Sequence, residues 1–164
     1  MIPKAEPEGI TELLENIPEE LRQRPQWVVW KLEKRIGDDK PTKIPYIAGG
    51  VVRASSTDLM TWRTFEEALQ ALETGRYDGV GFVFCSGDPF VGIDLDHCRN
   101  AETGKIKEWA QEIIDSVVDK YVEVSPSGTG VHIITRGKLR EGRKKGLLEI
   151  YGQEKFFTFT GVTL

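Results

Sequence analysis

A chain of 164 residues, of which 39% are hydrophobic and 29% charged, has the size and composition of one globular domain. Its formal net charge of −4 excludes a protein that coats nucleic acid through bulk positive charge, so any contact with nucleic acid must be local. The two cysteines show neither metal-binding nor disulfide spacing, and no apolar stretch is long enough to cross a bilayer. We therefore expect a soluble cytoplasmic protein with reduced thiols and no membrane contact.

The N-terminal half predicts short strands and one well-marked helix. Residues 26–32 are rich in β-forming side chains, and the prolines within residues 40–46 favour a short extended segment. Thr64 and Glu67 form a capping-box pattern, after which apolar residues recur at helical spacing until Gly75. The sequence therefore predicts a helix that begins after Thr64 and ends before Gly75.

The C-terminal half predicts more strands and a second helix. Apolar runs at residues 80–84 and 90–94 flank a turn-rich connection, so we expect them to form an antiparallel hairpin. Residues 106–118 place their apolar side chains on one helical stripe. Further strands are expected at residues 121–124, 131–135, 147–151 and 156–160. This order of elements predicts an α+β fold with a largely antiparallel sheet.

Two carboxylates stand two residues apart, at Asp94 and Asp96, near the end of a predicted strand. Alternation along a strand places both on one face, and Ile93 and Leu95 on the other. Such a pair repels itself unless a cation lies between the two acids, so it can form a site for hard cations. Taken alone, the pattern fits equally well a strand end that runs into solvent.

A glycine-rich turn at residues 125–130 directly precedes the strand that contains His132. Glycines let backbone amides approach a ligand, and small hydroxyls such as that of Ser127 can donate to phosphate oxygens. Strand parity turns Val131 and Ile133 to the core and leaves the imidazole on the opposite face. A histidine in a strand is often structural, but these neighbours favour phosphate binding.

Glu149 interrupts a predicted apolar strand between two aliphatic residues. Because burying an unpaired carboxylate is expensive, Glu149 either emerges on an open sheet face or meets a cation or a base. The same parity is expected to place Glu149 on one sheet face with Asp94, Asp96 and His132. Both predicted helices would then cover the other face of that sheet.

A basic segment separates the strand of His132 from that of Glu149. Its basic side chains are Arg136, Lys138, Arg140, Arg143, Lys144 and Lys145. A solvated loop between two strands and a phosphate-binding edge for nucleic acid are both consistent with this pattern.

Taken in order, these segments resemble the phage and plasmid primase-polymerases, bifunctional DNA primase/polymerase cores of the archaeo-eukaryotic primase superfamily. The resemblance extends from Trp27 to Gly161. It rests on residues 27–30, 40–46, 61–68, 92–96, 127–132, 148–151 and 156–161.

The resemblance implies a single catalytic domain over residues 1–164. Its parts would be a flexible leader (1–9), a small N-terminal α/β module (10–78) and an RRM-like, largely antiparallel catalytic sheet with helices on one face (79–164). It also implies template-dependent nucleotidyl transfer by a two-metal mechanism, with Mg²⁺ or Mn²⁺ as cofactor and dNTP or NTP substrates. Single-stranded or primer-template DNA is the expected partner, together with a helical accessory or helicase region absent from this chain.

Carried over by position, the resemblance makes Asp94, Asp96 and Glu149 catalytic metal ligands. It assigns nucleotide binding to Ser127 and His132 with the amides from Gly128 to Gly130, and adds Lys155 as a further phosphate contact. Lys43 joins the basic segment as a nucleic-acid contact.

Three other functions share parts of this pattern. A nucleotide-sugar glycosyltransferase would use the Asp-x-Asp pair to hold Mn²⁺, but leaves His132 and Glu149 unexplained. A non-catalytic nucleic-acid-binding domain would present aromatic and basic side chains, and three acids would repel a phosphate backbone. A metal-dependent nuclease could use the same acids for hydrolysis.

Overall fold

Aromatic and β-branched side chains build the first of two antiparallel sheets. The computed structural model describes residues 7–164. The strand order of the first sheet is β2 (Thr42–Tyr46), β1 (Trp27–Glu33), β3 (Gly79–Phe84) and β9 (Lys155–Phe159). Every residue of β3 is buried, which explains why its sequence is a continuous apolar run rather than an alternating one.

The second sheet contains the remaining strands. Its order is β5 (Tyr121–Val124), β6 (Val131–Arg136), β4 (Phe90–Leu95), β8 (Leu148–Tyr151) and β7 (Arg143–Lys145). All pairings in both sheets are antiparallel, so the predicted α+β class is confirmed, although the strands form two sheets where one largely antiparallel sheet was expected. The RRM-like topology stays a prediction.

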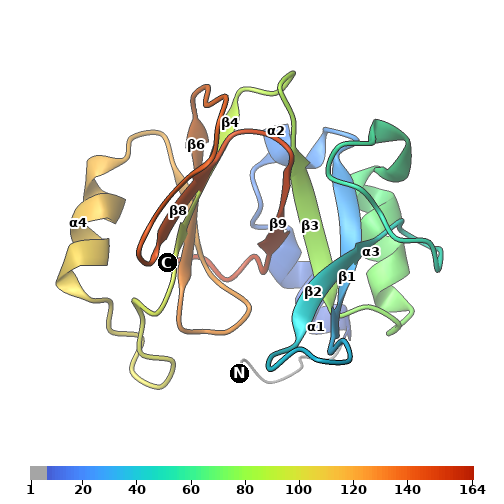
Figure 1. Ribbon diagram of the computed structural model, residues 1–164, viewed down its shortest axis with the longest axis horizontal. Coiled ribbons are helices and arrows are strands. Elements are labelled where there is room, and N and C mark those ends of the chain that lie inside the picture. The colour runs from blue at the N-terminus through green and yellow to red at the C-terminus, as the bar shows by residue number, and fades with distance from the viewer. Residues whose placement is uncertain (1–6) are drawn as a thin grey trace.

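The helices are short and lie on different sheets. They are α1 (Pro7–Leu14), α2 (Glu19–Arg22), the 3₁₀ helix η1 (Leu59–Thr61), α3 (Phe65–Glu73) and α4 (Glu108–Ser116). The predicted capping box opens α3, whose apolar side packs on the first sheet. In contrast, α4 packs on the second sheet, and Figure 1 shows the two helices at opposite ends of the molecule. The expectation that both helices cover one sheet is wrong, because periodicity identifies a buried face but not its partner.

The predicted hairpin of residues 80–84 and 90–94 is also wrong. These segments are β3 and β4, which belong to different sheets. The buried carboxylate of Asp88 accepts hydrogen bonds from the backbone amides of Cys85 and Phe90 and from Gln26 Nε2. Asp88 therefore satisfies the backbone amides of this turn without pairing between β3 and β4, and the chain crosses from one sheet to the other.

The connection between β8 and β9 crosses between the sheets in the same way. As a result, β3 and β9 share a sheet with β1, although the predicted division of the chain falls between residues 78 and 79. The two-module organisation stays a prediction. Of the predicted leader, residues 1–6 lie outside the described residues, and α1 begins at Pro7. No helix within residues 7–164 is both long and apolar enough to span a membrane.

The two sheets share one core, and they approach closely at Gly92. Phe84 and Phe157 from the first sheet belong to the same buried cluster as Phe90 and Ile134 from the second. A Cβ on Gly92 would lie 2.8 Å from the Phe84 ring and 3.2 Å from the Phe157 ring. A side chain at this position would therefore push the sheets apart.

We expect Gly92→Ala to lower the free energy of unfolding by about 1–3 kcal/mol, the usual cost of overpacking a core. Denaturant unfolding followed by tryptophan fluorescence measures the change. Gly87→Ala is the matched control, because Gly87 is exposed and the nearest atom, Cys85 Sγ, would lie 4.0 Å from the new Cβ. Equal stability of the two variants would contradict the role of Gly92 in sheet packing.

Candidate functional site

A row of polar side chains crosses all five strands of the second sheet. Asp94 on β4 is the direct cross-strand partner of His132 on β6 and of Glu149 on β8. The row extends to Glu123 on β5, which pairs with His132, and to Lys144 on β7, which pairs with Glu149. Directly opposed residues in antiparallel strands point to the same face, so these side chains form one continuous line.

The row lies on the face that meets the first sheet. Ile93, Leu95 and Ile133 point the other way, into the core under α4, as strand parity predicted. The polar face is covered rather than open at His132, whose ring centroid lies 4.4 Å from that of Phe157 on β9. Side-chain exposure is 0% at Glu123 and 6% at His132, 26% at Asp94 and 17% at Glu149, and 69% at Lys144. The open face expected from the sequence is therefore covered at one end.

His132 connects two carboxylates. Its Nδ1 lies 3.2 Å from Glu123 Oε1, and its Nε2 lies 3.7 Å from Asp94 Oδ1. The first distance is that of a hydrogen bond, and the second is too long for one. Sequence reasoning missed Glu123, although its position between Val122 and Val124 is the same signal that singled out Glu149.

Asp94 has an incompletely satisfied carboxylate. Burial raises the pKa of Asp94, and the negative charges of Asp96 and Glu149 raise it further, while His132 and Lys43 act in the opposite direction. Its Oδ1 is buried and finds no hydrogen-bond partner among the described residues. Such an oxygen is costly unless a ligand supplies the missing partner.

Two lysines stand near the acids. Lys144 forms an ion pair with Glu149, and this hydrogen bond raises the pKa of Lys144. Lys43 comes from β2 in the first sheet. Burial lowers the pKa of Lys43, while the charges of Asp94 and Asp96 act to raise it. Its ammonium also lies 5.6 Å from the centroid of the Trp30 ring. Lys43 is thus near enough to the acids for their charges to act on its ammonium.

Asp96 lies just beyond the end of β4 and is exposed. Its backbone amide donates to Leu147 O at 2.9 Å, which keeps this turn against the start of β8. Its charge acts on both Asp94 and Lys43. Asp94, His132 and Glu149 are therefore brought together on adjacent strands, and Asp96 lies in the turn directly after β4.

The loop at residues 125–130 is closed by its own hydrogen bonds. Ser127 Oγ lies 3.0 Å from Ser125 Oγ and 2.9 Å from Thr129 Oγ1. The amides of Gly128 and Gly130 donate to Ser125, as does that of Thr129 to Ser127. The predicted phosphate-binding amides are thus used inside the loop, whereas the Ser127 side chain is exposed.

This loop is also tied to the turn after Asp96. The backbone oxygen of Thr129 accepts from the amides of Cys98 and Arg99, both at 2.9 Å. Arg99 Nη1 donates to Gly128 O at 2.9 Å. The acid-bearing turn and the glycine-rich loop therefore form one structural unit.

The oxygen-rich donor set at Asp94 and Asp96 fits a hard cation in part. Within residues 7–164, no group of three or more His, Cys, Asp or Glu side chains is arranged to hold a metal ion as it stands, and Glu149 is paired with Lys144. Asp94 and Asp96 nevertheless supply the carboxylates that Mg²⁺ and Mn²⁺ prefer, and the unpartnered Asp94 Oδ1 fits such a ligand.

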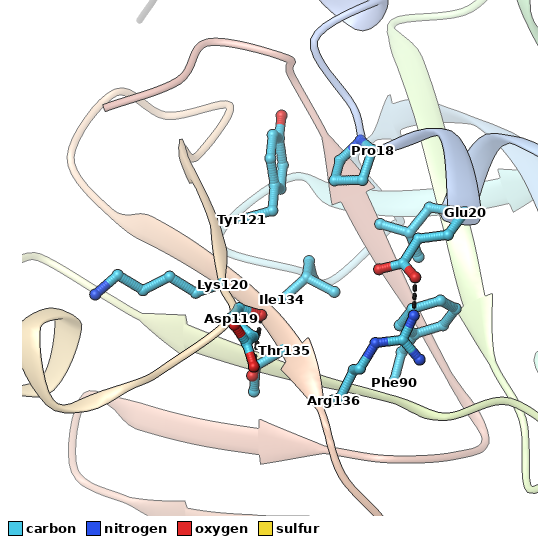
Figure 2. A pocket seen from close by; sticks show the side chains of 10 residues that line it. Pro18, Glu20, Phe90, Asp119, Lys120, Tyr121, Ile134, Thr135 and Arg136 are labelled. Carbon is cyan, nitrogen blue, oxygen red and sulfur yellow. Dashed lines mark hydrogen bonds and ion pairs between the residues drawn. The ribbon is translucent and has the colours of Figure 1, made fainter.

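Lys155 and Arg136 lie outside the row. Lys155 begins β9, and its ammonium lies 4.7 Å from the centroid of the Tyr151 ring. Arg136 pairs with Glu20 at the rim of a cavity of about 180 Å³, as the dashed line in Figure 2 shows. Arg136 is therefore already neutralised.

The remainder of the basic segment is exposed. Lys138 and Arg140 line a second cavity of about 370 Å³. Arg143, Lys144 and Lys145 form β7, so part of the expected loop is an edge strand. Exposed lysines on an edge strand also hinder unwanted strand pairing.

Asp94→Asn should stabilise the metal-free protein at neutral pH, by on the order of 1 kcal/mol, because functional sites commonly reduce stability. The raised pKa of Asp94 means that ionising it costs more in the folded state than in the unfolded state. The gain should be present near pH 7 and vanish below about pH 4, where the carboxyl is protonated in both states.

Denaturant unfolding at several pH values measures this difference. Asp96→Asn is the control, because Asp96 is exposed and its amide form should change stability little. A destabilised Asp94→Asn protein at pH 7 in metal-free buffer would show that the carboxylate is satisfied within the fold.

Comparison with known proteins identifies a phage relative. No protein-family model matches the chain. Over 144 residues the chain is 39% identical to a protein named DNA primase-polymerase from Nitratiruptor phage NrS-1. The similar region includes 83% of this chain but 19% of that protein, so the chain spans about a fifth of the length of its relative. The chain is thus similar, over most of its length, to one part of a phage DNA primase-polymerase, which agrees with the resemblance of its motifs.

Proposed function

We propose that the chain contains the nucleotide site of a DNA primase-polymerase, an enzyme that joins nucleotides from their triphosphates on a DNA template. The central observation is Asp94, which lies between His132 and Glu149 and has a buried oxygen with no hydrogen-bond partner among the described residues. The similarity to the phage DNA primase-polymerase supports the same function. Membership of the archaeo-eukaryotic primase superfamily and an RRM-like catalytic sheet are part of this proposal.

Asp94 and Asp96 would hold Mg²⁺ or Mn²⁺, with Glu149 as a third ligand once it leaves Lys144. When bound, the metal would supply charge stabilisation for in-line attack on the α-phosphate and departure of pyrophosphate. Because Lys144 is exposed and flexible, its ammonium can move to solvent at little cost. Glu149 then stays on its strand, directly opposite Asp94.

The triphosphate would lie against the glycine-rich loop. Ser127 and Thr129 present hydroxyls that now bond to each other and can turn to phosphate oxygens. His132 presents Nε2 beside Asp94. Lys43 contributes a positive charge from the other sheet, so we propose it as a contact for the incoming nucleotide rather than for nucleic acid.

Titration of a dNTP with Mn²⁺ into the protein should show metal-dependent binding that Asp94→Ala/Asp96→Ala abolishes. Isothermal calorimetry measures it, with a nucleotide sugar as the ligand control. Glu112→Ala/Asp115→Ala is the matched control, because it removes two exposed acids from α4 and leaves the row intact. Lys43→Met should weaken dNTP binding while sparing Mn²⁺ binding. No dNTP binding by the folded wild-type protein, or preference for the nucleotide sugar, would refute the proposal.

The exposed basic residues between β6 and β8 suit a single DNA strand. Lys138→Gln/Arg140→Gln should weaken binding of single-stranded DNA and make it less sensitive to salt. The logarithmic slope of affinity against salt should fall by about 0.7 for each basic side chain that no longer neutralises a phosphate. Fluorescence anisotropy at several salt concentrations measures this slope. Lys34→Gln/Arg35→Gln removes the same charge from exposed positions elsewhere, and an equal effect there would argue against a defined strand path.

A further inference from the structure

The carboxylate of Glu123 is the most completely enclosed polar group of the row, with 0% exposure. Its Oε2 accepts from the Tyr121 hydroxyl and the Gly161 amide, both at 2.9 Å. The Thr160 amide donates to both carboxylate oxygens at 3.1 Å. The remaining neighbour is His132 Nδ1, 3.2 Å from Oε1.

Each of these neighbours other than His132 is a donor. Backbone amides can only donate. Burial raises the pKa of Tyr121, and the Glu123 charge raises it further, so the tyrosine hydroxyl keeps its proton and donates as well. The carboxylate therefore acts as an acceptor, and the short contact to His132 is favourable only if Nδ1 is protonated.

We propose that Glu123 is a positioning residue that holds His132 in the tautomer with its proton on Nδ1. In a neutral imidazole, this tautomer leaves a lone pair on Nε2. That atom faces Asp94, 3.7 Å from Oδ1, and the Phe157 ring 4.4 Å away limits rotation of the imidazole. Any contact between Nε2, with or without a proton, and a nucleotide rests on the proposed function. The assignment of the tautomer does not.

A purely structural role would explain only part of this arrangement. Thr160 and Gly161 follow β9, so their bonds to Glu123 tie the two sheets together. That tie requires no particular state of His132. The two roles can therefore be separated by observing the imidazole itself.

The protein contains two histidines, which makes its imidazole nitrogens easy to assign. His97 is exposed and has a φ of 49°, a left-handed conformation that asparagine tolerates, so His97→Asn should leave a folded protein in which His132 is the single histidine. Long-range ¹H–¹⁵N correlation spectra at about pH 8, above the ordinary imidazole pKa of about 6.5, distinguish the two tautomers. We expect a protonated Nδ1 and an unprotonated Nε2. A protonated Nε2 in this protein would overturn the proposal without any further variant.

Two substitutions in this background test the role of the carboxylate. In Glu123→Gln the carboxamide oxygen should take the amides of Thr160 and Gly161, which leaves its NH₂ group facing Nδ1 and should transfer the imidazole proton to Nε2. Tyr121→Phe removes a different donor from the same carboxylate and should leave the tautomer unchanged. If both variants show the same tautomer, Glu123 connects the two sheets but does not set the tautomer of His132.

Titration of a dNTP with Mn²⁺ then connects the tautomer to the site. If the proposed function holds, Glu123→Gln should weaken dNTP binding by roughly 10- to 100-fold, the usual effect of losing a partner that orients a histidine. If the parent protein binds the dNTP and Glu123→Gln binds it with the same affinity, the role of Glu123 at the nucleotide is overturned. Absence of dNTP binding in the parent protein would count against the proposed function and leave the spectroscopic result standing.

Discussion

Burial of the Glu123 carboxylate constrains how the two sheets fit together. Glu123 belongs to β5 of the second sheet, and two of its donors are the amides of Thr160 and Gly161 that follow β9 of the first. A buried carboxylate without donors would cost several kcal/mol, so the sheets must meet where these amides reach it. Gly92 permits the approach because a larger residue would collide with Phe84. The hydrogen bonds that the Glu123 carboxylate needs, together with the absence of a side chain at Gly92, thus determine where the two sheets meet.

The polar row that starts at this join becomes less satisfied along its length. Glu123 has a full set of donors, and His132 is held by one carboxylate and one aromatic ring. Asp94 then has an oxygen without a hydrogen-bond partner among the described residues, and Glu149 pairs with the exposed Lys144. The enclosed end is held by internal hydrogen bonds, while the other end contains the oxygen that a ligand would satisfy under the proposed function. This division is typical of functional sites, which give up stability for binding.

Contacts between the sheets also change the meaning of individual residues. The sequence alone suggests that Lys43 is a surface lysine beside two prolines, yet its charge interacts with Asp94 and Asp96. Arg136 reads as part of a basic run, yet it pairs with Glu20. Charge in the sequence predicted both residues as phosphate contacts. Only their neighbours across the fold separate a lysine near the acids from an arginine in an ion pair.

Local patterns predicted most elements, because caps, turn residues and side-chain periodicity act over a few neighbouring residues. The capping box at Thr64 and the parity of Ile93, Ile133 and Glu149 are examples, and the order of the acids, the glycine-rich loop and the histidine was enough to identify the resemblance. The pairing of strands could not be predicted in this way, since the turn at Asp88 fits a hairpin as well as a crossing between sheets. Sequence by itself determined which residues share a face, because alternation is a property of one strand. Only the tertiary structure decided which strands are neighbours, and hence that Glu123, His132, Asp94, Glu149 and Lys144 form one row, because pairing depends on contacts between distant segments that share no local signal.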